Sequence, residues 1–332
     1  MKILITGING FIGSNIAHFL YNKGFEIYGT IRQNSNTCLI DDLNINKIIC
    51  DLNKIEENLF DNDFDFIIHC ASIVSDYANY FLSKKNILDS TINFFEKVVK
   101  NQKNLKKIIY ISTSLVLGYK KTNISEKNLG IPLKNNFYVK FKKETENFII
   151  NFCQKNKLNY TVLRPADVYG PRDRTSCFYM LSAIEKNIPM IVGHGNYLFP
   201  YCSIKTLCNA VESSILYKES DNKSYVVTSG IDITWKQFFS YFQNKFNKKQ
   251  WIYIPNFIAK LGAKFSLLFH KIFPSFKPSI TPYRITRITT NTSYDISETI
   301  KDLKITPHTN YEEDLEEIYN WYMKFKKIGK LK

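Results

Sequence analysis

Three residues in the middle of the chain have the types and spacing of a proton-transfer site. Tyr138 and Lys142 are four positions apart, and Thr113 lies 25 residues before Tyr138. On a helix, residues four apart share one face, so we expect the Lys142 ammonium to lie near the Tyr138 phenol. A nearby cation lowers a phenol pKa that starts from about 10. Tyr138 is therefore a candidate general acid or base, with the Thr113 hydroxyl as a second hydrogen-bond partner of the reacting oxygen.

A glycine-rich segment near the start of the chain has the form of a dinucleotide-binding loop. Gly7, Gly10 and Gly13 follow a short apolar run and precede a helical pattern over Ser14–Lys23. Glycines permit a tight turn and close approach of the backbone, and the helix N-terminus then offers free N–H groups to a pyrophosphate. The segment predicts a dinucleotide site.

The end of the second predicted strand indicates which dinucleotide binds. NAD sites commonly carry a carboxylate there to accept hydrogen bonds from the ribose. Here the strand ends at Ile31-Arg32, and the next carboxylate is Asp41. A guanidinium matches a 2′-phosphate and accepts no hydrogen bond from a ribose hydroxyl. Arg32 thus favours NADP(H), while NAD(H) stays open because an arginine in an exposed loop can also bind no ligand.

Short apolar runs alternate with longer amphipathic stretches through the first half of the chain, which is typical of repeated βαβ units and a parallel sheet. Such a sheet binds ligands beyond the carboxyl ends of its strands, where Asp51 and His69-Cys70-Ala71-Ser72 lie. We interpret His69 as a packed structural histidine. The predicted strands are Lys2–Thr6, Glu26–Ile31, Lys47–Cys50, Phe66–Cys70, Ile108–Ser112 and Thr161–Arg164.

These elements predict an α/β fold, a Rossmann-type doubly wound parallel sheet, in a dinucleotide-binding domain over residues 1–172. Beyond about residue 170 the pattern loosens into mixed strands, loops and helices without a Gly/Ser linker. We therefore expect residues 173–332 to form a smaller, partly interleaved substrate-binding lobe.

Several motifs occur together along nearly the whole chain: Thr6-Gly7-x-x-Gly10-x-x-Gly13, Asp51-Leu52, His69-x-Ala71, Asn86, Thr113, Tyr138-x-x-x-Lys142 and Arg164-Pro165-x-x-Val168-Tyr169-Gly170-Pro171-Arg172. In this order and spacing the set resembles the extended short-chain dehydrogenase/reductases, specifically the NAD-dependent epimerase/dehydratase family. The resemblance implies hydride chemistry on a nucleotide sugar.

The resemblance also implies the roles of individual residues. The catalytic set is Thr113, Tyr138 and Lys142. The expected cofactor site is Gly7, Asn9, Gly10, Phe11, Ile12, Gly13, Arg32, Asp51, Leu52, Cys70, Ala71, Ser72, Asn86, Tyr138, Lys142, Pro165 and Val168. The expected substrate site is Ser72, Thr113, Ser114, Asp167, Arg172 and Arg174. No metal ligand is expected.

Departures from the family pattern narrow the chemistry. Dehydratases of the family carry acids at the two positions after the catalytic threonine, where this chain has Ser114 and Leu115. Without a proton donor for a departing hydroxyl, the sequence favours plain ketone/alcohol redox over dehydration. Many members also carry asparagine in place of Asp167, whose charge would repel a diphosphate. The compensating cation is left open among Arg172, Arg174, Arg284 and Arg287.

Four functions stay open from the sequence. The preferred one is reduction of a 4-keto sugar nucleotide by hydride from NADPH, because carbonyl reduction suits NADPH. The second is a nucleotide-sugar 4-epimerase with tightly bound NAD. The third is an enzyme of a hydrophobic or lipid-linked alcohol, resembling 3β-hydroxysteroid dehydrogenases and dihydroflavonol reductases. The fourth is a non-catalytic Rossmann-type binding scaffold.

The net charge of +15 is concentrated in one segment. Residues 233–294 contain ten Lys or Arg and no carboxylate. Within them, Asn256–Phe273 has the pattern of a basic amphipathic helix. We favour an apolar stripe packed on the second lobe with lysines in water, and keep peripheral attachment to anionic lipid as the alternative.

The remaining composition concerns partners and compartment. No nucleic-acid-binding motif accompanies the basic residues, so we expect no nucleic acid partner. The chain lacks a run of about 20 apolar residues and a secretory signal, and its seven cysteines contain no C-x-x-C pair. We expect a cytoplasmic protein with reduced thiols, and the family resemblance implies a homodimer.

Overall fold

The computed structural model describes residues 1–55, 63–188, 191–248 and 253–328. Its centre is a seven-stranded sheet with the strand order β10-β6-β5-β4-β1-β2-β3, and every neighbouring pair is parallel. The strands are β1 (Lys2–Thr6), β2 (Glu26–Ile31), β3 (Asn46–Ile49), β4 (Phe66–His69), β5 (Lys107–Ile111), β6 (Asn159–Pro165) and β10 (Lys223–Val227). The order reverses between β1 and β4, which is the switch point of a doubly wound sheet.

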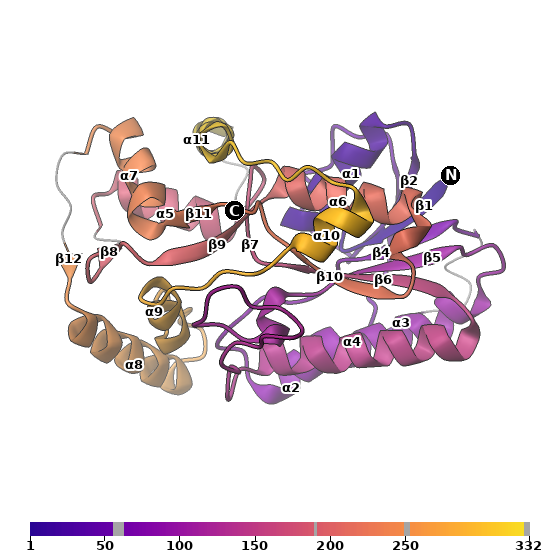
Figure 1. Ribbon diagram of the computed structural model, residues 1–332, viewed down its shortest axis with the longest axis horizontal. Helices are drawn as coiled ribbons and strands as arrows, with labels where there is room; N and C mark the ends of the chain where they lie inside the picture. Colours follow the sequence, from indigo (N-terminus) through magenta and orange to yellow (C-terminus); the bar gives the residue numbers. More distant parts are fainter. Residues whose placement is uncertain (56–62, 189–190, 249–252, 329–332) are drawn as a thin grey trace.

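Helices cover both faces of this sheet (Figure 1). One layer contains α1 (Phe11–Asn22), α6 (Ile204–Leu216) and α10 (Ser297–Leu303), and the other contains α2 (Tyr80–Ser83), α3 (Ser90–Lys97) and α4 (Phe137–Asn156). Successive side chains of β1 point to opposite faces of the sheet and so contribute to both cores. Ile3 and Ile5 pack in the core under α1 and α6, whereas Leu4 packs in the core under α3 and α4. A π-helical turn, η2 (Lys84–Asp89), joins α2 to α3, and short 3-10 turns occur at η3 (Val99–Asn101), η4 (Ser114–Leu117) and η5 (Lys218–Ser220).

The second lobe lies beyond the carboxyl ends of the sheet (Figure 1). It contains a three-stranded sheet of β7 (Asp167–Tyr169), β9 (Leu198–Ser203) and β11 (Asp232–Thr234), and a pair of β8 (Ile191–Val192) with β12 (Tyr253–Ile254). Its helices are α5 (Ser176–Glu185), α7 (Trp235–Lys245), α8 (Asn256–Ile272), α9 (Pro282–Ile288) and α11 (Tyr311–Ile328). A core rich in aromatic residues, including Phe199, Phe238 and Tyr322, holds β9, α7 and α11 together.

The predicted fold class is confirmed. Strands β1 and β2 have the predicted bounds, and the other four predicted strands differ at one or both ends by no more than two residues. Interleaving arises because the chain returns from the second lobe to the sheet, where β10 pairs with β6 and α6 covers the sheet face. The division at residue 172 is a prediction about domains that the connectivity itself does not test.

The predicted helix over Asn256–Phe273 is present as α8, but our preferred interpretation of its packing was wrong. Only Ala259 and Ala263 of this helix are buried, whereas its bulky apolar residues are exposed. The small residues allow α8 to sit close to its neighbours, so the apolar stripe faces away from the lobe. No helix in the described part of the chain combines the length and the hydropathy that crossing a bilayer requires.

Candidate active site

The carboxyl ends of β1 and β4 are locked together by one threonine. The Thr6 hydroxyl accepts hydrogen bonds from the backbone N–H groups of Cys70 at 3.2 Å and Ala71 at 3.1 Å, and it lies 2.9 Å from His69 Nδ1. The Thr6 proton is thus donated to Nδ1, and the protonated Nε2 then donates to the Thr91 hydroxyl at 2.9 Å. Burial lowers the pKa of His69 to about 3, so this histidine is a neutral structural group as predicted.

The glycine-rich loop between β1 and α1 leaves room only for backbone. Gly7 has φ +66°, and a Cβ there would approach the Ala71 Cα to 3.0 Å. A Cβ on Gly13 would lie 2.4 Å from the Gly7 carbonyl oxygen. Gly10 caps α1 without any side-chain hydrogen bond, so the first N–H groups of the helix are left for a ligand. This cradle fits a dinucleotide pyrophosphate, which the motif predicted.

The catalytic tyrosine is positioned by the start of α4. The Asn136 side chain accepts a hydrogen bond from Val139 N at 3.1 Å, which begins the helix and places Tyr138 in its first turn. Thr113, buried at the carboxyl end of β5, forms a hydrogen bond with the Tyr138 hydroxyl. The structure therefore brings together two of the three predicted catalytic groups directly.

The expected lowering of the tyrosine pKa is wrong for this structure. Burial raises the pKa of Tyr138 to about 12, and the hydrogen bond with Thr113 only partly opposes that rise. The sequence argument considered the nearby cation but not the loss of hydration. At neutral pH the phenol is protonated, so it is equipped to donate a proton to a developing alkoxide.

Lys142 is buried one helical turn beyond Tyr138. Its ammonium donates to the Ile111 carbonyl oxygen at 2.7 Å and lies 4.6 Å from the centre of the Tyr110 ring. Burial lowers the pKa of Lys142 to about 8, although Cys70 and Glu146 oppose that shift. Lys142 is therefore a cation fixed between α4 and the end of β5 at neutral pH.

The residues predicted to bind the adenosine end lie beside each other at the ends of β2 and β3. Arg32 and Asp51 are both exposed. The pKa of Asp51 is lowered, chiefly by the backbone N–H of Asn53 and to a smaller extent by the Arg32 guanidinium. The two exposed side chains thus interact electrostatically.

The two arginines after β7 contact the glycine-rich loop and the helix that follows it. Arg174 donates to the Asn9 carbonyl oxygen at 3.3 Å and to Cys38 Sγ at 3.8 Å. Arg172 donates to Asn15 Oδ1 on α1 at 3.2 Å. These contacts direct both guanidinium groups to the glycine-rich loop and its helix, and their role as substrate ligands stays a prediction.

Asp167 has a partly buried partner, Arg287, which the sequence left among four candidates. Arg287 on α9 donates from Nε to Asp167 Oδ2 at 2.8 Å, and its Nη2 contacts the same oxygen. Burial raises the pKa of Asp167 and Arg287 opposes that rise; two nitrogens on one carboxylate make the pair ionic at neutral pH. Arg287 also lies 3.3 Å from the Tyr169 hydroxyl and 5.5 Å from the centre of the Trp235 ring. The negative charge expected to repel a diphosphate is thus neutralised.

A second ion pair crosses from the nucleotide-binding side to the second lobe. Asp76, in the loop after β4, accepts from Arg284 Nη2 at 3.0 Å and from the Thr281 hydroxyl. The Tyr77 ring of the same loop packs edge-on against the His270 ring, with 5.0 Å between the ring centres. Sequence reasoning missed Asp76. The available signal was that arginines in a carboxylate-free segment must find carboxylates elsewhere in the chain.

The other predicted site residues surround these groups. Ser114 is buried and forms a hydrogen bond with Tyr294, whose hydroxyl also donates to the Gly118 carbonyl oxygen at 2.8 Å. Asn86 lies on the π-helical turn η2, where it donates to the Leu82 carbonyl oxygen at 2.9 Å. The structure places Leu52, Cys70, Ser72, Pro165 and Val168 at the carboxyl ends of β3, β4 and β6 and in β7.

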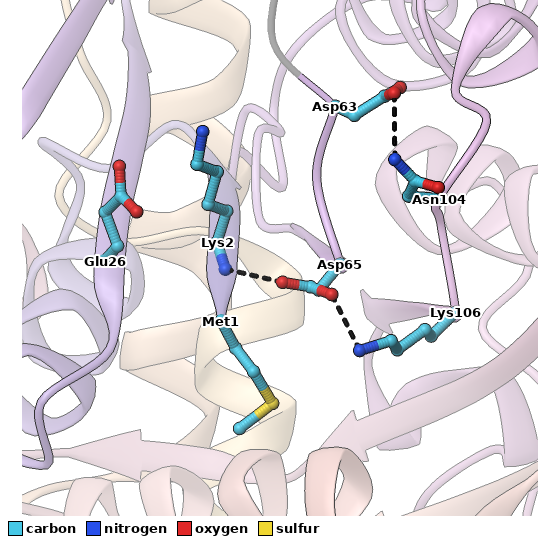
Figure 2. Close-up of a pocket in the computed structure, with 7 residues that line it drawn as sticks. All are labelled: Met1, Lys2, Glu26, Asp63, Asp65, Asn104 and Lys106. Carbon is cyan, nitrogen blue, oxygen red and sulfur yellow. Dashed lines mark hydrogen bonds and ion pairs between the residues drawn. The ribbon is translucent and has the colours of Figure 1, made fainter.

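A polar hollow at the opposite edge of the sheet is structural rather than catalytic. Figure 2 shows it between the amino ends of β1 and β2 and the segments that precede β4 and β5. Asp65 accepts from Lys2 N at 2.8 Å and pairs with Lys106 at 2.7 Å, and Asn104 donates to Asp63 at 3.1 Å. Its polar groups bind one another. Among the described residues, no three His, Cys, Asp or Glu side chains form a group able to hold a metal ion.

Known proteins resemble the chain in sequence and fold. The model of the NAD dependent epimerase/dehydratase family matches residues 3–227. Protein CapI of Staphylococcus aureus is 24% identical, covering 98% of this chain and 100% of that protein. UDP-glucose 4-epimerase of Vibrio cholerae is 22% identical, covering 95% and 94% of the two chains. The structure of UDP-glucuronic acid 4-epimerase from Bacillus cereus, in complex with UDP-glucuronic acid and NAD, has a TM-score of 0.78 at 22% identity and covers 98% and 100%.

These findings agree with the glycine-rich cradle, the Thr113–Tyr138 pair and the buried Lys142. They exclude the interpretation of the chain as a non-catalytic scaffold. The chain belongs to the NAD dependent epimerase/dehydratase family and is an NAD(P)-dependent enzyme of the short-chain dehydrogenase/reductase type.

Proposed function

We propose that the protein reduces a 4-keto group of a nucleotide-diphospho-sugar, with NADPH as the hydride donor. The observation that carries this proposal is the protonated Tyr138, which is hydrogen-bonded to Thr113 and lies one helical turn from the buried Lys142 cation. A bound nicotinamide cofactor supplies hydride to the carbonyl carbon or accepts it in the reverse direction. The protein's own residues manage the proton and the charge at the carbonyl oxygen.

Proton delivery falls to Tyr138. Its hydroxyl gives its proton to the oxygen that becomes an alcohol, while the Thr113 hydroxyl orients that oxygen. Losing the proton leaves a phenolate, which the Lys142 ammonium stabilises electrostatically because both groups lie in a buried region. The raised pKa of Tyr138 supports the reductive direction, since the group begins the reaction in its protonated form.

The diphosphate end of the substrate is assigned to the second lobe. Arg287 is fixed by Asp167, and in the bonds described its Nη1 takes no part. A guanidinium held in one orientation binds a diphosphate with less loss of conformational freedom than a mobile side chain. The names of the relatives, UDP-glucose 4-epimerase and UDP-glucuronic acid 4-epimerase, support a sugar nucleotide as the substrate class.

Two arginines supply positive charge to the cofactor site, and the preference for NADPH depends on Arg32. Arg32 stands exposed beside Asp51, where an adenosine 2′-phosphate would compete for its guanidinium. Arg174 lies against the glycine-rich loop, so it adds positive charge near the pyrophosphate cradle. Of the two, only Arg32 supplies a cation where NADP(H) carries its extra negative charge, because the pyrophosphate is common to NAD(H) and NADP(H).

The second candidate function is a 4-epimerase with tightly bound NAD. The same three residues would remove and return the proton while the sugar ketone turns over between two hydride transfers. The two epimerases among the relatives favour this alternative, and one of their structures holds NAD. We further propose that the protein is cytoplasmic and forms a homodimer. Sedimentation of the purified protein tests the homodimer directly.

The cofactor that copurifies with the protein separates the two functions. We expect the protein to be purified without retained NAD, to be stabilised against heat more by NADPH than by NADH, and to consume one NADPH per 4-keto sugar reduced. Retained NAD, together with interconversion of two sugar nucleotides without net NADPH consumption, would favour the epimerase instead.

A further inference from the structure

Helix α8 lies beside α9 at the periphery of the second lobe (Figure 1). Its alanines are buried, whereas most of its large apolar residues are exposed. Ala259 and Ala263 are buried against β8 and α9. Phe257, Phe265 and Ile272 are 71%, 61% and 62% exposed. The helix also exposes Ile258, Leu261, Leu268 and Phe269. A surface helix normally directs its apolar stripe into the core, so the orientation of α8 indicates a partner outside this chain.

The apolar surface continues beyond the helix. The Phe269 ring contacts Phe273 at 4.7 Å and Phe276 at 5.0 Å between ring centres. His270 Nδ1 lies 2.5 Å from the Phe276 carbonyl oxygen, which holds the turn after the helix against it. Phe273, Phe276 and Ile280 are themselves exposed. We call the exposed apolar residues of 257–280, together with the lysines among them, the α8 surface.

Positive charge borders the apolar residues of the α8 surface. Lys260, Lys264 and Lys271 are exposed and, at about 100° per residue, project within about 40° of one another along one edge of the apolar stripe. Lys277 follows in the turn, and residues 233–294 contain no carboxylate. Long lysine side chains beside a buried apolar face reach the polar layer of a membrane while their stems stay in apolar surroundings.

We propose that the α8 surface docks on the surface of an anionic lipid bilayer. Outward phenylalanines, leucine and isoleucine match the boundary between head groups and acyl chains, and the adjacent lysines match anionic head groups. A second copy of this chain fits less well, because two-fold contact between identical α8 surfaces would bring lysines of the same sign together. This inference is independent of which sugar nucleotide the enzyme uses.

The docked helix would lie close to the candidate active site. His270 of α8 contacts Tyr77, and Arg284 of the following helix pairs with Asp76. Both partners belong to the loop that follows β4, whose carboxyl end borders the site. Membrane binding would therefore hold this border of the site near the lipid surface.

Vesicle flotation of the full-length protein tests the proposal. We would compare vesicles of phosphatidylcholine alone with vesicles of phosphatidylcholine and phosphatidylglycerol in equal parts, at low and at high salt. An apolar variant carries F257Q, F265Q and I272Q, and a charge variant carries K260Q, K264Q and K271Q. The matched control carries I49Q, Y179Q and I300Q, three exposed apolar residues on other elements. Thermal unfolding and NADPH binding verify that each variant is folded.

We expect the protein and the matched control to bind anionic vesicles at low salt, and the apolar and charge variants each to bind about tenfold more weakly. Binding to neutral vesicles and at high salt should be weaker than to anionic vesicles at low salt. Absence of binding by the folded protein, or equal binding by the apolar variant, would overturn the proposal. So would conversion of an oligomer to monomers by the apolar variant with vesicle binding unchanged, since a second copy would then be the partner.

Discussion

The partly buried pair of Asp167 and Arg287 allows a stability prediction with a defined size. The change is Arg287→Met, which removes the guanidinium and leaves the carboxylate in place. The side chains of Asp167 and Arg287 are 13% and 30% exposed. Removing one partner of a buried pair costs about 3–5 kcal/mol, and the partial exposure of Arg287 puts our expectation near about 3 kcal/mol. Loss of the contact with the Trp235 ring is included in that figure.

A double-mutant cycle isolates the electrostatic part. In an Asp167→Asn background, Arg287→Met removes the packing of the arginine but leaves no carboxylate unpaired. We therefore expect it to lower the free energy of unfolding by about 1 kcal/mol there. The coupling free energy should therefore be about 2 kcal/mol, measured by urea unfolding of all four proteins at neutral pH. Lys277→Met, an exposed cation of the same lobe, is the matched control and should leave stability unchanged.

The destabilisation caused by Arg287→Met should also depend on pH. Burial raises the pKa of Asp167 in the folded state above its unfolded value, so ionisation of an unpaired Asp167 destabilises the protein. That destabilisation is complete above the folded pKa and is lost as pH falls toward the unfolded pKa. Arg287→Met should thus be less destabilised relative to the wild type at pH 5 than at pH 8. A cost that is additive in the cycle and independent of pH would refute the proposed burial of an ion pair.

Three further predictions concern the cofactor and the catalytic cation. Gly13→Ala forces a Cβ to within 2.4 Å of the Gly7 carbonyl oxygen. It should therefore destabilise the protein by about 1–3 kcal/mol and abolish NADPH binding measured by fluorescence. The control Gly262→Ala, whose Cβ would meet its nearest neighbour at 3.5 Å, should do neither. Arg32→Ser should weaken NADPH binding about 10–100-fold while changing NADH binding little, and equal losses for both cofactors would contradict the 2′-phosphate assignment. The pKa of Lys142 is about 8 and its charged form is the active one, so kcat/KM of the wild type should fall as pH rises through about 8. The control Lys140→Met, an exposed change on the same helix, should show the same fall. A flat profile to alkaline pH would contradict this role of Lys142.

Local patterns predicted the nucleotide-binding half well. Strands β1 and β2 follow from runs of apolar residues that are buried on both faces, and the glycine-rich loop follows from spacing within eight residues. Tyr138 and Lys142 are likewise related by a single helical turn. Signals of this kind are contained in adjacent residues, so no knowledge of the tertiary structure is needed to read them.

Features that depend on distant contacts were not predictable in the same way. Asp167 and Arg287 are 120 residues apart, and the sequence offered four possible partners for Asp167. Asp76 and Arg284 are 208 residues apart, and no local pattern in the sequence indicates this pair. The pKa of Tyr138 depends on burial by several elements, which is why the expected direction was wrong. Similarly, the periodicity of α8 showed an apolar stripe but not which way it faces, because packing against β8 and α9 decides that.

Proton donation by Tyr138 is the step on which the proposed reduction depends most directly. The decisive measurement is the rate of NADPH oxidation with a panel of 4-keto nucleotide sugars, compared between the wild type and Tyr138→Phe under single-turnover conditions. Removing only the hydroxyl should lower the rate about 10²–10⁴-fold while the dissociation constant for NADPH changes little. A Tyr138→Phe rate close to that of the wild type, with the cofactor still bound, would contradict the account.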